Sequence, residues 1–186
     1  MSTYQTTGII LKISDRGEAD QVFSIYTKSK GKILALGKGT KKIQSKLNGQ
    51  LQYFSLVYLM IAPGKMHDHI ASAEIVLNHP KIKSDLKKII LASFALELVE
   101  KMTRNGQPEP DIFLLLENFF KVVENETFDA VKINKYKRMF VVKLLGILGF
   151  APPVGIINSE KKLTDFLTTH LEMPLLSVKL LAKIKS

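Results

Sequence analysis

The stretch "QVFSIYTKSKGKILALGKG", residues 21–39, decides the fold of the N-terminal part of this chain. Its first seven residues are mostly β-branched or aromatic, which is typical of a strand. The tetrapeptide "KSKG", residues 28–31, indicates a tight turn, and "KILALGKG" indicates the returning strand. The stretch therefore predicts a lysine-rich β-hairpin.

Similar patterns surround this hairpin as far as residue 80. Residues 9–13 alternate in the manner of a strand. "LQYFSLVYLMIA", residues 51–62, is a bulky apolar strand that the Pro63-Gly64 turn closes, and "HIASAEIVL", residues 69–77, follows it. Because about five short strands are joined by close turns, we expect a small β-barrel such as an oligonucleotide-binding (OB) fold.

Beyond residue 80 the period of the apolar residues becomes helical. Ser84 or Asp85 can cap a helix that runs to about Lys101. Asp111 begins a second helix, a third covers residues 128–148, and shorter amphipathic segments follow at residues 160–172 and 174–184. The buried stripe of the second helix is expected to be Leu115, Leu116, Phe119, Phe120 and Val123.

The expected fold class is α+β, with an N-terminal β-barrel followed by a C-terminal α-helical bundle. We expect residues 1–80 to form an OB-fold-like barrel that binds nucleic acid. Residues 81–186 are expected to form a helical domain that binds a partner protein.

Composition narrows the class of protein. The chain has 186 residues, of which 46% are apolar and 24% charged, as in ordinary globular proteins. A net charge of +10 favours a polyanionic partner. The chain has no cysteine, so disulfides and thiolate metal sites are excluded. No signal peptide or membrane-spanning pattern is visible, and a cytoplasmic protein is expected.

The stretch "ALGKGTKKIQSK", residues 35–46, suggests either a nucleotide-binding loop or a surface that binds nucleic acid. A Walker A loop would need glycine at position 32 and a hydroxyl residue after Lys38, but Lys32 and Gly39 occupy these positions. No Asp or Glu occurs between Gln21 and His67. We therefore expect a lysine-rich face that contacts phosphates without reading bases.

The candidate DNA-binding residues are lysines from this acid-free window and one aromatic residue on which a base can stack. They are Lys28, Lys30, Lys32, Lys38, Lys41, Lys42, Lys46 and Tyr26. The alternative is a solvated hairpin whose lysines protect exposed strand edges.

Two other clusters carry weaker signals. A metal site is suggested by His67, Asp68 and His69, but no fourth ligand is evident. The acids of the D-x-x-E-x-D pattern, residues 15–20, are the basis of a rival hypothesis, a metal-dependent nuclease. The simpler interpretation of Asp20 is that it accepts hydrogen bonds from backbone donors near a turn.

Residues 6–20 and 23–59 resemble the N-terminal barrel of the bacterial RecO recombination mediators. The shared features are Asp20, Thr27, Gly31, Lys32, Lys38, Gly39, the Lys41-Lys42 pair, Ser45, Leu51, Gln52 and Phe54. "KRMFVVKLLGILGF", residues 137–150, is similar to a bundle helix of that family, and residues 170–184 are similar to its final helix, with Ser177 and Lys179 at recurring positions.

The resemblance has one large departure. Many members carry a cysteine-rich zinc module after the "GF" at residues 149–150. Here "APPVGIINSEKK", residues 151–162, is short and contains no cysteine. Zinc is therefore not carried over, and no cofactor is expected.

The resemblance implies a non-enzymatic, nucleoid-associated protein that binds single- and double-stranded DNA and anneals complementary strands. With RecR, such proteins help load RecA onto strands coated by single-stranded DNA-binding protein (SSB). It also implies that basic residues of the bundle, here Lys135, Lys137 and Arg138, bind the acidic C-terminal tail of SSB. The residues alone favour an ordinary solvated helix face. The alternative function is an RNA-binding barrel protein of translation or the ribosome.

Overall fold

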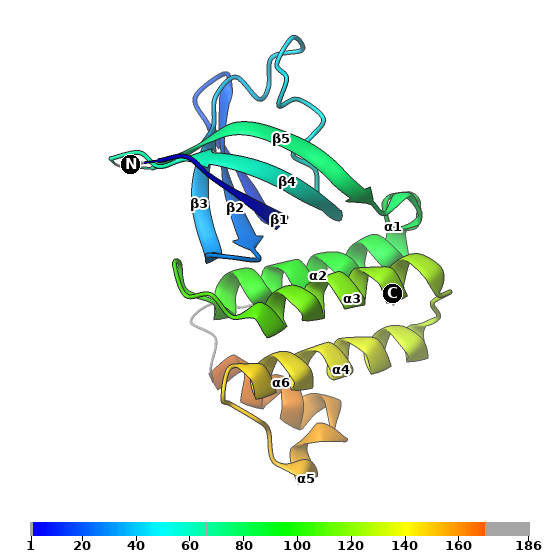
Figure 1. The fold of residues 1–186 in the computed structure, drawn as a ribbon. Helices are drawn as coiled ribbons and strands as arrows, with labels where there is room; N and C mark the ends of the chain where they lie inside the picture. The colour runs from blue at the N-terminus through cyan, green and yellow to red at the C-terminus, as the bar shows by residue number, and fades with distance from the viewer. Residues whose placement is uncertain (1, 66, 170–186) are drawn as a thin grey trace. The chain divides into compact units, whose positions relative to one another are not determined.

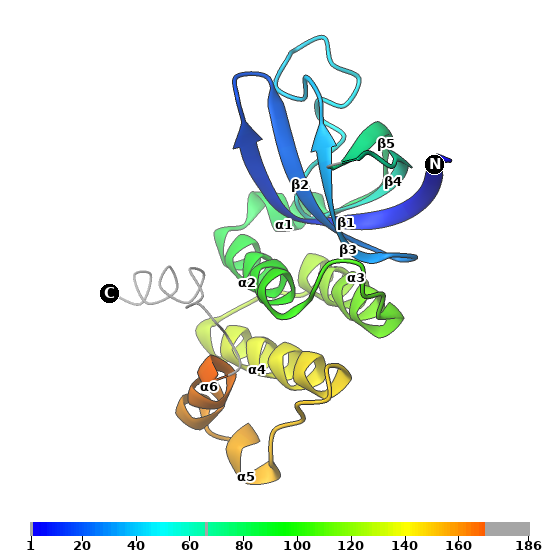
Figure 2. The same ribbon diagram turned by 90° about the vertical axis from the view of Figure 1, so that its left-hand side faces the viewer.

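The computed structural model describes residues 2–65 and 67–169, and Figures 1 and 2 show its ribbon. The chain forms two compact units. The first contains the residues up to His79 together with Thr103–Phe113, and the second contains Pro80–Met102 and the chain from Leu114 onward. The expected boundary at residue 80 had assigned residues 103–113 to the helical part. The segment at residues 174–184, with Ser177 and Lys179, lies outside the described residues.

The first unit is built on a closed five-stranded barrel, which confirms the barrel expected from the sequence. Around the barrel the strands follow the order β1-β2-β3-β5-β4. This closed order is that of an OB-type barrel. The strands are β1 (Tyr4–Arg16), β2 (Asp20–Thr27), β3 (Gly31–Gly37), β4 (Ser55–Ala62) and β5 (Asp68–Asn78).

Strand β1, like each strand of the closed barrel, pairs with two neighbours. It is antiparallel to β2 along one edge and to β4 along the other. The barrel closes where β3 and β5 run parallel, through the pairs Ala35–Asp68 and Leu36–His69. Alternate residues of the strands point inward, and the fully buried core residues include Ile10, Phe23, Ile25, Val57, Leu59 and Ile61.

The segment Thr103–Phe113 is attached to the barrel at the start of β3. The Gly106 amide donates to the Lys32 carbonyl over 2.8 Å, and the Tyr26 hydroxyl donates to the Glu109 carbonyl over 3.1 Å. Gly31 permits this close approach, since a Cβ atom there would lie 2.6 Å from the Gln107 carbonyl carbon. The segment thus covers part of the outer face of β2 and β3.

The helices agree with the periodicity of the sequence at most of their boundaries. They are α1 (Pro80–Ser84), α2 (Leu86–Met102), α3 (Pro110–Asn125), α4 (Ala130–Ile147), α5 (Val154–Ile157) and α6 (Glu160–Thr169). Asp85 caps α2, because its Oδ1 accepts from the Lys87 amide over 2.8 Å. The short helices α1 and α5 were not expected.

In the helical unit α4 contacts both α2 and α6 (Figures 1 and 2). Phe119 of α3 and Phe140 of α4 pack with their ring centroids 4.7 Å apart. None of the helices within residues 2–65 and 67–169 combines the length and apolar character that crossing a membrane requires.

Candidate nucleic-acid interface

The loop between β3 and β4, residues 38–54, carries most of the candidate lysines, and we call it the β3–β4 loop. It extends away from the end of the barrel in both ribbon views (Figures 1 and 2). The Gly39 amide donates to Asp20 Oδ1 over 2.7 Å, and the Lys41 amide donates to the Ala19 carbonyl over 3.1 Å. These bonds fix the first part of the loop to the β1–β2 turn.

The rest of the loop is held by local turns and by two apolar anchors. The Lys42 amide donates to Gly39, and the Ser45 amide donates to Lys42, over 2.9 and 3.0 Å. Leu47 and Leu51 belong to the buried core of the barrel. Because both ends are fixed, the loop presents its exposed side chains from a defined backbone.

Lys38, Lys42 and Lys46 are the free cations of this loop. All three are exposed, and none forms an ion pair with a carboxylate of residues 2–65 or 67–169. Lys41 differs, because its Nζ lies 2.8 Å from Asp15 Oδ2. The hydrogen bond from Lys41 is the largest cause of a lowered pKa of Asp15, and Gln21 contributes a second bond.

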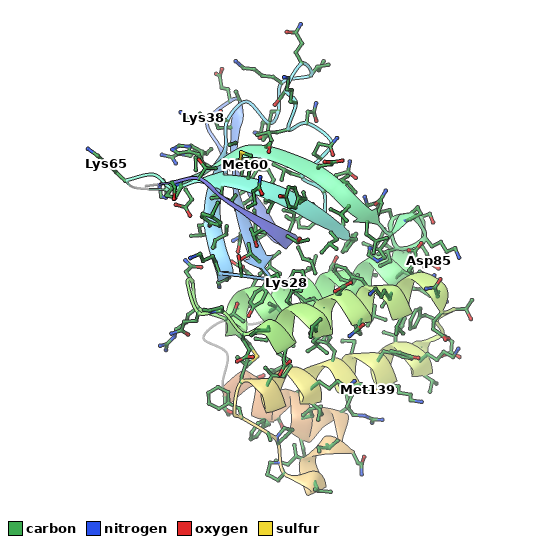
Figure 3. The ribbon with its side chains drawn as sticks, viewed as in Figure 1. Lys28, Lys38, Met60, Lys65, Asp85 and Met139 are labelled. Carbon is green, nitrogen blue, oxygen red and sulfur yellow. The ribbon has the colours of Figure 1, made fainter. Side chains whose placement is uncertain are left out.

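The expectation of one continuous lysine face is wrong. Lys28 and Lys30 lie in the turn before β3, whereas Lys38 follows the end of β3. Figure 3 shows Lys28 and Lys38 at opposite ends of the barrel. A seven-residue strand separates its ends by roughly 20 Å, at about 3.3 Å per residue. The lysines of the acid-free window therefore do not form one continuous face.

Two of the candidate residues are buried. Tyr26 is 1% exposed and Lys32 is 9% exposed. Tyr26 offers no ring face to a base, because its side chain is buried and its hydroxyl donates to the Glu109 carbonyl. Burial also raises the pKa of the phenol to about 12. OB folds commonly bind oligonucleotides on the outer face of strands 2 and 3. Here the segment Thr103–Phe113 occupies part of that face.

Tyr53 and Tyr58 are exposed aromatic residues of the barrel, and Tyr4 is partly exposed. Tyr53 is 37% exposed, and its hydroxyl accepts from the Ile13 amide over 2.9 Å. This bond places Tyr53 near the end of β1 that carries Asp15, the ion-pair partner of Lys41. Tyr58 is 39% exposed on β4, whereas Phe23 and Phe54 are buried.

The acidic and histidine clusters do not form a metal centre in the described part of the chain, where no three potential ligands lie together. Asp15 pairs with Lys41, and Asp68 accepts a hydrogen bond from Tyr4. Asp20 accepts from the Gly39 amide, which confirms its expected role near the turn. His69 is partly buried next to the β4–β5 loop.

The candidate partner-binding residues divide between two faces of α4. Lys137 Nζ lies 4.7 Å from the centroid of the Phe94 ring, so it packs toward α2. Lys135 is exposed and Arg138 partly exposed, three positions apart on one side of the helix. Val131, Met139 and Lys143 are also exposed on α4, although no pattern in the sequence singles them out.

The arrangement at the β3–β4 loop suits contacts to phosphate groups. Ammonium groups on flexible stems attract polyanions without fixing the identity of the bases. Residues 38–54 contain no Asp or Glu, and the nearby Asp15 and Asp20 contact the Lys41 ammonium group and the Gly39 amide. The exposed ammonium groups of Lys38, Lys42 and Lys46 are therefore chemically suited to contacts with phosphates.

These features define a two-unit protein with an OB-type barrel, a lysine-rich β3–β4 loop and a helical bundle. Family profiles match both parts, "Recombination protein O N terminal" at residues 1–79 and "Recombination protein O C terminal" at residues 83–154. The chain belongs to the RecO family.

Individual relatives agree with this assignment. Proteins named "DNA repair protein RecO" from Gloeothece citriformis and Nostoc sp. are 33% and 31% identical, over 82% and 83% of this chain. The protein of that name from Pelotomaculum thermopropionicum is 28% identical over 82% of the chain. The matches cover 53%, 52% and 57% of these relatives, so the chain spans about half of their length.

Proposed function

We propose that this chain acts in recombinational DNA repair as a non-enzymatic mediator. It binds single- and double-stranded DNA, anneals complementary strands and, with RecR, helps load RecA onto DNA coated by SSB. The observation that carries the proposal is the ordered β3–β4 loop with its free cations, in a chain of the RecO family. The name of the relatives supports the repair role.

Annealing follows from the physical properties of such a surface. Two nucleic-acid strands repel one another, and lysines that screen phosphates reduce this repulsion. Because the lysines make no contact that requires one base, the strands remain able to sample registers until they pair. This mechanism needs no bond to be made or broken by the protein.

Charge reversal of the loop tests the proposal. The triple variant Lys38→Glu, Lys42→Glu, Lys46→Glu should lose annealing of complementary fluorescent oligonucleotides while its unfolding temperature stays unchanged. The matched control reverses Lys81, Lys161 and Lys162, which are exposed lysines of the helical unit, and it should keep the activity. Equal activities of the two triple variants would refute the assigned surface.

A second part of this experiment compares two kinds of nucleic acid. Competition between DNA and RNA oligonucleotides of one sequence at fixed salt distinguishes a repair protein from an RNA-binding barrel. Tighter binding of RNA would favour the alternative function. Cleavage of labelled DNA with Mg²⁺ or Mn²⁺ would contradict the non-enzymatic assignment.

The exposed side of α4 is the proposed site for the acidic tail of SSB. Lys135 and Arg138 provide cations for carboxylates, and Met139, which is 41% exposed, provides apolar surface. Arg138→Glu should weaken binding of an acidic tail peptide and leave oligonucleotide binding intact. Lys81→Glu, an equal change of charge on α1, is the control, and equal loss in both variants would remove this site.

A further inference from the structure

Ile43 at the tip of the β3–β4 loop is an apolar side chain without a packing role. Its exposed fraction is 93%, larger than that of any other large hydrophobic side chain in the described residues. Burial of such a side chain is favourable in proportion to the apolar area removed from water. A partner that covers Ile43 would therefore gain binding free energy from its burial.

The backbone around Ile43 is fixed before any partner binds. The Ser45 amide donates to the Lys42 carbonyl over 3.0 Å, which closes a tight turn with Ile43 and Gln44 at its tip. Asn48 Nδ2 reaches the same carbonyl over 3.4 Å. A prearranged tip loses less conformational entropy on binding than a flexible loop does.

The surroundings of Ile43 are cationic. Lys42 precedes it directly, and Lys38 and Lys46 lie in the same loop, all without carboxylate partners in the part of the chain that the structure describes. The one ion pair of the loop among those residues, Lys41 with Asp15, fixes the base of the loop. An apolar tip among free ammonium groups matches a partner with apolar faces between negative charges.

Nucleic acids have this chemistry, because flat bases alternate with phosphates along the strand. Proteins that deform nucleic acids insert isoleucine, leucine or phenylalanine between adjacent bases, and lysines bind the flanking phosphates. A single strand needs only unstacking for such an insertion, with no base pair to break. An open hollow of about 640 Å³ beside the tip, lined by Gly39, Lys41, Lys42, Ile43, Gln44 and Ser45, leaves room for a displaced base.

We propose that Ile43 is a wedge that enters between two neighbouring bases of a bound single strand, while Lys38, Lys42 and Lys46 bind the adjacent phosphates. This inference rests on the proposed nucleic-acid function. It adds a contact with the bases that is independent of their identity. By separating neighbouring bases, the wedge exposes their edges to a complementary strand.

The test uses a single-stranded oligonucleotide with 2-aminopurine, whose fluorescence increases when the base unstacks. Saturating amounts of the wild-type chain should increase the fluorescence, and Ile43→Ser should abolish most of that increase. The same variant should bind about three- to tenfold more weakly, as expected for the loss of a partly buried isoleucine side chain. Ile43→Leu should retain both properties.

The matched control is Val154→Ser, which makes a similar change at an 80% exposed position of the helical unit. Wild-type protein that binds no oligonucleotide would refute the proposed function. Normal binding with equal fluorescence for wild type and Ile43→Ser would refute the wedge and leave the function standing. Vesicles of anionic phospholipid form the last arm, and loss of vesicle binding alone in Ile43→Ser would assign the tip to a membrane surface instead.

Discussion

At the scale of single residues, Asp15 limits the positive charge of the β3–β4 loop. Its carboxylate holds the Lys41 ammonium group at 2.8 Å, which removes one of the loop lysines from the free set. The hydrogen bond from Lys41 is also the main cause of the lowered pKa of Asp15. The acid therefore stays ionised at neutral pH and continues to compete with phosphates for Lys41.

We predict that Asp15→Asn binds single strands about two- to threefold more tightly at low salt, because the change frees the Lys41 ammonium group for phosphates. The gain is small because exposed charge pairs are weak, and salt screens the added attraction. Binding titrations at two salt concentrations measure this gain, which should fade at high salt. Glu74→Gln removes the same charge from β5 and should have a smaller effect. Equal gains in both variants would show that net charge, and not Lys41, is responsible.

Tyr26 provides a prediction about pH. Burial raises the pKa of its hydroxyl from an ordinary 10.0 to about 12. The unfolded chain loses this proton first as pH rises, so the contribution of Tyr26 to stability is complete below pH 10 and declines between pH 10 and about 12. Tyr26→Phe should have a shallower decline in the free energy of unfolding in that range.

At neutral pH the same variant should lose about 1 kcal/mol, because the hydrogen bond to the Glu109 carbonyl is removed. Urea unfolding at several pH values measures both effects. The ultraviolet absorbance of tyrosinate reports the ionisation directly. An unchanged slope above pH 10 would mean that Tyr26 ionises at its ordinary pKa.

At the scale of elements, the attachment of Thr103–Phe113 to β3 depends on Gly31. Gly31 has a φ angle of 64° and faces the Gln107 carbonyl, whereas Gly17 has the same φ angle with no atom within 4 Å of a Cβ position. Alanine at Gly17 therefore tests the backbone conformation alone. Alanine at Gly31 tests the conformation and the contact together.

We predict that Gly17→Ala costs about 1 kcal/mol of unfolding free energy and that Gly31→Ala costs about 2–4 kcal/mol. Hydrogen exchange of the Gly106 amide, which donates to the Lys32 carbonyl, should accelerate in Gly31→Ala beyond the change in global stability. Equal costs for the two variants would contradict the role of the Gln107 contact.

Most of the longer elements were predictable, because their apolar residues repeat with the period of a strand or of a helix. The strands β2 and β3 and the helices α2 to α4 agree with the apolar patterns of the sequence. Strand β4 begins at Ser55 and not at Leu51, since Tyr53 and Phe54 form a turn in which Phe54 has a φ angle of 59°. Local patterns do not reveal such a turn among bulky apolar residues.

The candidate site was less predictable, because lysines that are close in the sequence can lie far apart in the fold. Lys28 and Lys38 belong to one acid-free window, yet β3 separates them. The burial of Tyr26 and Lys32 depends on a segment about eighty residues further along the chain, which no local pattern indicates. Ile43 is a single apolar residue in a polar loop, so no repeating pattern of apolar residues marks it.

At the scale of the whole molecule, the net charge of +10 is a poor guide to affinity at physiological salt. Charges that lie more than one Debye length, about 8 Å, from the bound strand are largely screened. Lysines that touch phosphates act differently, because each releases a condensed counterion on binding. The contact lysines should therefore dominate the salt dependence.

We predict that Lys42→Gln reduces the slope of log K against log salt for single strands by about 0.7, the value for one phosphate contact. Lys161→Gln, which removes the same charge from α6, should lower affinity slightly without changing the slope. Oligonucleotide titrations at four or five salt concentrations measure the slopes. Parallel slopes for wild type and Lys42→Gln would show that Lys42 does not contact phosphate.

The double pairing of β1 also has a consequence for the newly made chain. β1, β2 and β3 are joined by short turns, so this meander can form soon after it leaves the ribosome. The other edge of β1 stays unpaired until β4 is synthesised, which happens after the long β3–β4 loop. During that interval the nascent chain carries an open strand edge, and such an edge can recruit a neighbouring copy on the same polysome.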